Sequence, residues 1–181
     1  MGVSELIGHL FIMTMPNESR TTLGQLFLCT FCIMNIEVIG LFISEKEIEI
    51  RYAETDQMGV VYHANYLVWL EIGRTKLIDD LGYTYAGLEA DGYLSPVTDL
   101  SIQYKAAMKY GQKALVRTWV ESHGRLRTSY GYEIVHEDGT IGATAISEHV
   151  VVKKENFRPV SLAKIAPEWD AKYKEIQRLK D

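Results

Sequence analysis

The sequence has few cysteines and no excess of positive charge, and both features limit the classes of protein to which it can belong. Its 181 residues include only two cysteines, Cys29 and Cys32, so the chain beyond residue 32 forms no internal disulfide and suits a reducing compartment, the cytoplasm. A formal net charge of −5, from 19 basic and 24 acidic residues, argues against binding to nucleic acid through a broad positive surface. The sequence also lacks internal repeats and low-complexity segments, and its length suits one ordinary domain.

The segment from residue 23 to residue 43 is hydrophobic and about as long as a membrane span, but Gln25, Asn35 and Glu37 interrupt it. Three interpretations compete. A secretory signal peptide would need a basic start and a small-residue cleavage site, whereas the only base nearby is Arg20. A weak membrane anchor would place Glu37 at the lipid interface.

The third interpretation is that residues 1–41 result from a misassigned start. Glu37-Val38-Ile39 can be encoded by GAG-GTG-AT, which resembles a bacterial ribosome-binding site, and a TTG codon read as Leu41 would then be the start. The intact mass of protein made from its native gene tests this hypothesis, because a mass that includes residues 1–40 excludes it. With either an anchor or a misassigned start, we interpret the pair Cys29 and Cys32 as incidental rather than redox-active.

In the remaining chain, apolar residues alternate with polar ones in ways typical of strands. In residues 46–52, Ile48 and Ile50 alternate with charged residues, which predicts a half-buried first strand. Further strands are predicted near residues 94–107, 112–123, 126–137 and 140–153. Turn-type pairs separate them: Tyr110-Gly111, His123-Gly124 and Asp138-Gly139. Three consecutive hairpins would make these four strands an antiparallel meander.

Residues 64–81 have the spacing of a long helix that ends before Gly82. Apolar residues occupy most of its circumference, so we predict that the helix is buried and that Arg74 neutralises Glu71 within it. The fold class is therefore α+β, with one sheet curved around one helix. Such a sheet leaves its edges without partners, so we expect at least a dimer with sheets joined edge to edge. Residues 161–181 predict a solvated, lysine-rich terminal helix.

A polar loop lies between the first strand and the helix. Its Asp56 precedes a helix start near His63 by seven residues, and Gly59 allows a sharp turn between them. The first amides of a helix lack internal acceptors and carry partial positive charge, so a carboxylate held near them suits hydrolysis of an activated acyl group such as a thioester. Equally, Asp56 is typical of a turn or a helix cap, and His63 and Asn65 alone are uninformative.

The stretch "RYAETDQMGVVYHANYLVWLEIGR" resembles the hydroxybenzoyl-CoA thioesterase family of hotdog-fold proteins, over roughly residues 42–160. The family pattern is an aspartate, two residues, a glycine, two apolar or aromatic residues, a tyrosine or histidine, and an Asn-Tyr pair that opens the central helix. The matching residues are Asp56, Gly59, Val60, Val61, Tyr62, His63, Asn65 and Tyr66. Residues 1–41 have no counterpart in the family, so we divide the chain into an extension (1–41), a hotdog domain (42–160) and a C-terminal helix (161–181).

This resemblance implies hydrolysis of acyl-CoA thioesters at a subunit interface of a homodimer or homotetramer, with no cofactor or metal. It implies that Asp56 is nucleophile or general base, that the backbone amide of His63 holds the thioester oxygen while its imidazole assists, and that the other matched residues bind substrate. The neighbouring subunit would add strand residues 96–98 to the acyl pocket. The CoA phosphates would meet Lys153, Lys154 and Arg158, unless these form only a solvated charge run. We expect no nucleic-acid partner and no membrane association. The alternative is a hotdog domain that binds acyl-CoA as a sensor or scaffold without turnover.

Overall fold

The structure is a computed structural model, which describes residues 41–178. The segment 23–43 and the extension 1–41, to which the three interpretations refer, therefore lie outside the described residues except for residues 41–43, and both cysteines lie outside them too. Within residues 41–178, no helix combines the length and hydrophobicity that a membrane crossing requires.

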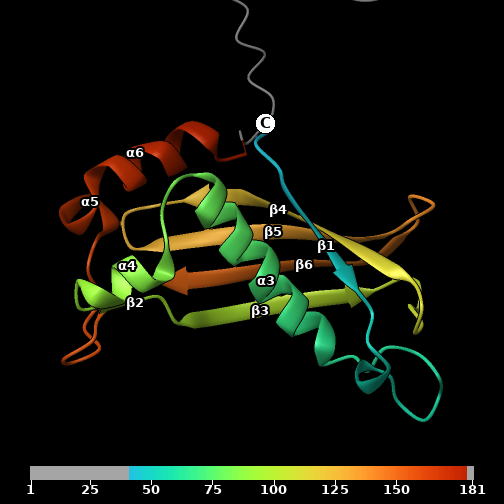
Figure 1. The fold of residues 1–181 in the computed structure, drawn as a ribbon. Coiled ribbons are helices and arrows are strands. Elements are labelled where there is room, and N and C mark those ends of the chain that lie inside the picture. Colours follow the sequence, from blue (N-terminus) through green and yellow to red (C-terminus); the bar gives the residue numbers. More distant parts are fainter. Residues whose placement is uncertain (1–40, 179–181) are drawn as a thin grey trace, which may run out of the picture. The chain divides into compact units, whose positions relative to one another are not determined.

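The described residues form a five-stranded antiparallel sheet with one long helix across one face (Figure 1). The strand order is β1-β4-β5-β6-β3, and the helix is α3 (Asn65–Asp80). This is the α+β arrangement predicted from the sequence, with a sheet that curves around one helix. The strands are β1 (Ser44–Glu49), β3 (Val97–Tyr104), β4 (Lys113–His123), β5 (Arg127–His136) and β6 (Ile141–Val150).

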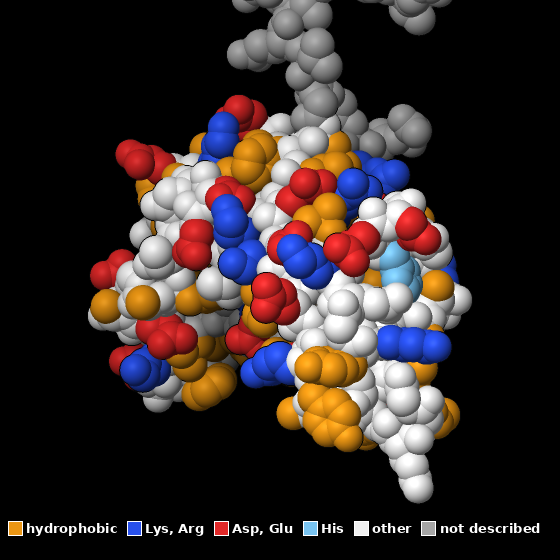
Figure 2. Space-filling view, turned by 45° about the vertical axis from the view of Figure 1, so that its right-hand side comes forward, with side chains coloured by type: hydrophobic (Ala, Val, Ile, Leu, Met, Phe, Trp, Pro, Cys, Tyr) orange, Lys and Arg blue, Asp and Glu red, His pale blue; other side chains and the backbone are white. Residues whose placement is uncertain are grey.

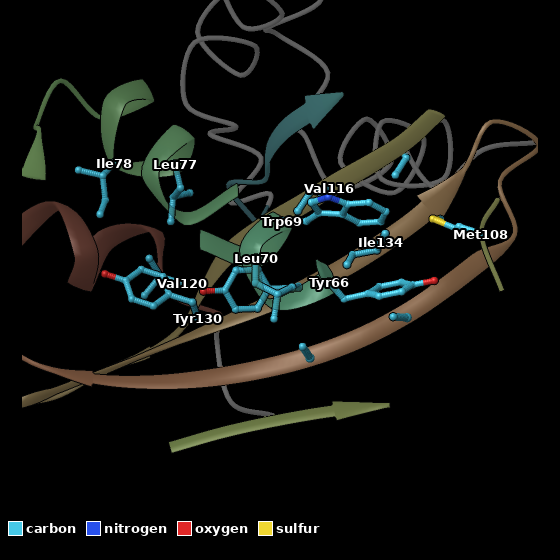
Figure 3. Close-up of a cluster of buried hydrophobic side chains, with 14 of the residues drawn as sticks. Tyr66, Trp69, Leu70, Leu77, Ile78, Met108, Val116, Val120, Tyr130 and Ile134 are labelled. Carbon is cyan, nitrogen blue, oxygen red and sulfur yellow. The ribbon is translucent and has the colours of Figure 1, made fainter. Parts of the chain in front are cut away.

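The alternation read from the sequence gives the sheet its two faces. Val116, Thr118 and Val120 of β4 are fully buried under α3, and Tyr130 and Tyr132 of β5 lie beside them on the same face. Figure 3 shows Val116, Val120 and Tyr130 beside α3 residues such as Trp69 and Leu77, both of which are fully buried. The apolar face of the sheet therefore receives the helix, as the period-two pattern predicts.

The prediction of three consecutive hairpins is wrong at its first turn. Strands β4, β5 and β6 do form a meander, but β3 lies beside β6 at one edge, and β1 pairs with β4 at the other. The connection from β3 to β4 must therefore cross from one edge of the sheet towards the other. Met108 in this connection is fully buried, and its carbonyl accepts a hydrogen bond from the Val61 N–H at 2.8 Å, so residues 105–112 form a loop anchored to the core at Met108 rather than a hairpin turn.

The helix is not buried all round in the protomer. Its outward side leaves Leu67, Val68 and Ile72 between 37% and 50% exposed. Glu71 is exposed on this side, and no ion pair joins it to Arg74 in the described part of the chain, so the predicted neutralisation is wrong. Arg74 instead lies buried, donates a hydrogen bond to the Tyr85 hydroxyl and stands 4.7 Å from the centre of its ring.

The C-terminal segment forms two short helices, because a non-helical Ala166 precedes Pro167. It is not the solvated cover that the lysines suggested, since Trp169 and Tyr173 are buried against the core. Asp170 is buried too, with His123 Nε2 at 2.9 Å and Lys174 Nζ at 2.7 Å from its carboxylate. The remaining elements are η2 (Tyr52–Glu54), α4 (Tyr85–Ala90), α5 (Leu162–Ile165), α6 (Pro167–Ile176), and the paired strands β2 (Tyr93–Leu94) and β7 (Val152–Lys153).

Candidate active site

The polar loop of residues 55–61 is closed by its own backbone. The Asp56 N–H donates to the Val60 carbonyl at 2.9 Å, and the Gly59 N–H donates back to the Asp56 carbonyl at 2.9 Å. Gly59 has a φ of 74°, which a glycine adopts without strain. The turn therefore brings Val61 back to Thr55, with which it forms an isolated β-bridge, and α3 begins four residues later.

Asp56 has both a structural and a candidate chemical role in this loop. Its Oδ1 accepts a hydrogen bond from the Met58 N–H at 2.8 Å, as expected of an aspartate in a turn. The same residue lines a cavity of about 240 Å³. His63, Val60, Val61 and Tyr66 line this cavity as well, so the structure brings together five residues that the motif predicted.

The beginning of α3 offers unpaired backbone donors beside this cavity. The residue before the helix, Ala64, makes no side-chain cap. Neither its N–H nor that of His63 has a hydrogen-bond partner within residues 41–178. Unsatisfied amides at a helix start carry about half a positive charge, which favours a developing negative charge on a nearby oxygen.

The other wall of the cavity comes from the end of β3, which the sequence did not single out. Tyr104, Lys105, Ala106 and Ala107 line it. The Tyr104 hydroxyl donates to the His63 carbonyl at 3.0 Å and so ties the sheet edge to the helix start. Burial raises the pKa of both Tyr104 and Tyr66, which keeps these phenols protonated at neutral pH. No local signal in the sequence links residue 104 to residue 63, because the contact depends on the strand order.

Three matched residues lie beside the cavity rather than on its wall. Gly59 is at the tip of the turn, and Tyr62 packs against the His63 ring at 4.3 Å between ring centres. The Asn65 side-chain amide donates to the Glu54 carbonyl at 2.7 Å, so Asn65 braces the loop. These positions suggest support for the site, and contact with substrate at them stays a prediction.

The basic residues predicted for the CoA phosphates lie elsewhere in the protomer. Lys153 and Lys154 line a separate cavity of about 420 Å³ together with Asp91, Gly92 and Tyr93. This cavity is beside β2 and β7, at the opposite end of the sheet from the Asp56 loop (Figure 1). Arg158 lies nearby, since its carbonyl accepts from the Lys153 N–H at 3.0 Å. The structure therefore does not bring these cations to Asp56 within one protomer.

The surface around the loop is apolar, whereas the neighbouring surface is mixed in charge. Tyr52, Met58, Tyr62 and Tyr110 are large side chains that are at least 46% exposed. Figure 2 shows hydrophobic side chains gathered at the lower right of the molecule, and interspersed acidic and basic side chains above and to the left of them. The described residues contain no group of three or more histidine, cysteine or carboxylate side chains able to hold a metal ion.

Comparison with known proteins assigns the chain to a family. Residues 50–172 match the family model described as the Thioesterase-like superfamily. The chain belongs to this superfamily. Among thioesterase-like relatives, the Bacillus subtilis (strain 168) protein named "Putative acyl-CoA thioesterase YneP" is 49% identical over 138 residues, covering 76% of this chain and 100% of the relative.

Solved structures agree with this family assignment. The DHNA-CoA thioesterase from Staphylococcus aureus is 45% identical, with a TM-score of 0.72 over 74% of this chain and 90% of that chain. A hypothetical protein from Thermus thermophilus, TT1821, is 31% identical, with a TM-score of 0.65 over 74% of this chain and 96% of that chain. These matches confirm the prediction of a hotdog-fold protein of the thioesterase family.

Proposed function

We propose that this protein hydrolyses acyl-CoA thioesters to a free acid and CoA. Asp56 would attack the thioester carbonyl or activate a water molecule for that attack, and the amides of His63 and Ala64 would stabilise the negative oxygen that develops. The observation that carries this proposal is a single cavity lined by Asp56 and His63 at the start of α3, where two amides have no partner among residues 41–178. A thiolate leaves readily, so the reaction needs neither a serine nucleophile nor a metal.

Thiol release from acyl-CoA tests the proposal directly. The substrates are short, aromatic and long acyl-CoAs, and 1,4-dihydroxy-2-naphthoyl-CoA belongs to the aromatic group because the Staphylococcus aureus relative is named a DHNA-CoA thioesterase. We expect purified protein to release free CoA from at least one of them at a rate proportional to enzyme concentration. Absence of thiol from every substrate contradicts the proposed activity.

The alternative function is binding of acyl-CoA without turnover. The hydrogen bond from Met58 N–H to Asp56 Oδ1 favours it, because this contact gives Asp56 a structural role that needs no chemistry. One experiment, prolonged incubation with acyl-CoA, distinguishes the two functions. A binding protein would bind acyl-CoA stoichiometrically and leave the thioester intact during prolonged incubation, whereas an enzyme would consume it.

We also propose that two copies pair along β3 and complete the site. All eight residues of this edge strand are at least partly exposed, and Tyr104 is 48% exposed although it faces α3. Antiparallel pairing of two β3 strands about a two-fold axis would set the partner's Val97 and the partner's Thr98 near the end of this β3, where Tyr104 lines the cavity. The partner's Lys153 would then approach from the adjoining β2–β7 pair, as the predicted phosphate role requires.

Sedimentation velocity checks this assembly. We expect a particle of two or four chains at micromolar concentration, because an open eight-residue edge strand favours pairing with another strand. A monomer at the concentrations that support hydrolysis would contradict a shared site.

A further inference from the structure

A buried carboxylate lies two residues before Asp56 and joins the parts of the candidate site. Glu54, the last residue of η2, is 5% exposed. Its Oε1 accepts hydrogen bonds from Arg51 Nη2 at 2.9 Å and from Trp69 Nε1 at 3.2 Å. Its Oε2 accepts from the Arg51 backbone N–H at 2.8 Å. Both oxygens are therefore occupied, by donors from the preceding turn and from α3.

The backbone of the same residue holds the far end of the loop. The Glu54 carbonyl accepts from the Tyr62 N–H at 2.8 Å and from Asn65 Nδ2 at 2.7 Å. Asp56 and the turn through Gly59 lie between Glu54 and Tyr62, the two residues that the first of these hydrogen bonds joins. Glu54 thus connects the beginning of the loop, its end beside His63, and two positions on α3.

Three N–H donors point at this carboxylate, and only its ionised form accepts all of them without offering a donor of its own. Burial by itself would raise the pKa of Glu54. The hydrogen bonds from the Arg51 side chain and backbone and from Trp69 outweigh burial, so the pKa lies below its ordinary value. Glu54 is therefore ionised at neutral pH, and each of its carboxylate oxygens accepts at least one hydrogen bond.

We propose that Glu54 is a positioning residue for thioester hydrolysis, which holds Asp56 at a fixed place relative to the start of α3. This inference rests on the proposed function. Glu54 does not line the cavity, so it acts through Asp56 rather than on the substrate. Displacement of a reacting group by about 1 Å can lower a rate roughly a hundredfold, which makes the anchoring of such a loop relevant to catalysis.

A double-mutant cycle tests the role. In Glu54→Gln, the amide keeps one acceptor oxygen but directs N–H donors at one of the N–H groups around it, so the loop loses an anchor. We expect kcat per folded molecule to fall at least tenfold with KM changed less than threefold. In an Asp56→Asn background, Glu54→Gln should lower kcat no further, because Glu54 acts only through the Asp56 carboxylate.

Two further variants separate positioning from general stability. Trp69→Phe keeps the buried ring but removes one donor to Glu54, so it should lower kcat in the same direction by a smaller factor. Asp170→Asn alters another buried carboxylate, which contacts His123 at the end of β4 and Lys174 within α6. Figure 1 shows α6 at the opposite end of the sheet from the loop that precedes α3. We expect Asp170→Asn to lower the melting temperature while kcat per folded molecule stays the same.

The outcomes distinguish this inference from the proposed function. If Glu54→Gln retains kcat within twofold, or lowers it by the same factor with and without the Asp56 carboxylate, the positioning role is wrong while hydrolysis stands. If wild-type protein releases no thiol from any acyl-CoA, the proposed function fails, and the positioning role of Glu54 fails with it.

Discussion

Asp56→Asn is expected to lower kcat for acyl-CoA hydrolysis at least a hundredfold, which corresponds to about 2.7 kcal/mol in the activation barrier. Asparagine has nearly the same shape and still accepts a hydrogen bond from the Met58 N–H, so the turn should persist. The amide lacks the negative charge that attacks a carbonyl or takes a proton from water. Binding of acyl-CoA, measured by calorimetry, should therefore change little while thiol release nearly stops.

The chain offers a matched control for this substitution. Asp138 accepts a hydrogen bond from the Thr140 N–H at 2.8 Å, the same two-residue turn contact that Asp56 makes with Met58. It lies in the turn between β5 and β6, away from the cavity. Asp138→Asn should leave kcat unchanged. Equal losses in the two variants, or full activity in Asp56→Asn, would show that the aspartate acts only as a turn residue.

Gly73→Ala is expected to destabilise the fold by roughly 1–3 kcal/mol, because α3 lies tightly against β4 at this glycine. A Cβ atom at residue 73 would stand 2.5 Å from Thr118 Oγ1 and 2.6 Å from Val116 Cγ1, both buried on β4. Alanine favours a helix over glycine by about 1 kcal/mol, but contacts this short force the helix away from the strand. Thermal unfolding should show a decrease of about 2–4 °C for each kcal/mol.

Gly124→Ala provides the comparison for this loss of stability. An added Cβ there would meet nothing nearer than the Arg127 carbonyl at 3.7 Å, an ordinary contact distance. Its melting temperature should stay within about 2 °C of wild type, since a substitution without a clash changes stability by only about 0.5 kcal/mol. A Gly73→Ala protein as stable as wild type would mean that the helix has room above β4.

Local sequence patterns predicted where the strands lie in the chain better than they predicted which strands lie side by side in the sheet. The alternation in β4 and β5 and the pairs His123-Gly124 and Asp138-Gly139 correctly placed one central meander. The position of β3 could not be read in the same way, because a period of two tells which side chains share a face and not which strand lies alongside. The Tyr110-Gly111 pair looked like a hairpin turn, but it belongs to the loop that Met108 packs against the core.

Burial of helices was also harder to predict than their existence. Residues 64–81 were correctly predicted as a helix, but composition alone could not show that Leu67, Val68 and Ile72 face outward in the protomer. In the C-terminal segment, the lysines suggested solvent exposure. Trp169 and Tyr173 lie on the side of α6 that packs on the sheet, and the Tyr173 hydroxyl is 2.9 Å from that of Tyr130.

The candidate site likewise has one part that the sequence predicted and another that it did not. Asp56, Val60, Val61, His63 and Tyr66 lie within eleven consecutive residues, so a motif in one stretch predicted one wall of the cavity. The wall from Tyr104 to Ala107 is distant in sequence and depends on β3 being an edge strand. Glu54 was overlooked because its sequence neighbours do not reveal that Trp69 donates to it across fifteen residues. Roles in catalysis and in CoA binding remain predictions for all of these residues.

A crystal structure of the Asp56→Asn variant with an uncleaved acyl-CoA tests the central claim most directly. The account predicts a thioester oxygen within about 3 Å of the His63 or Ala64 N–H, with residue 56 beside the carbonyl carbon. A thioester bound away from the start of α3, with those amides unoccupied and residue 56 out of reach, would contradict it.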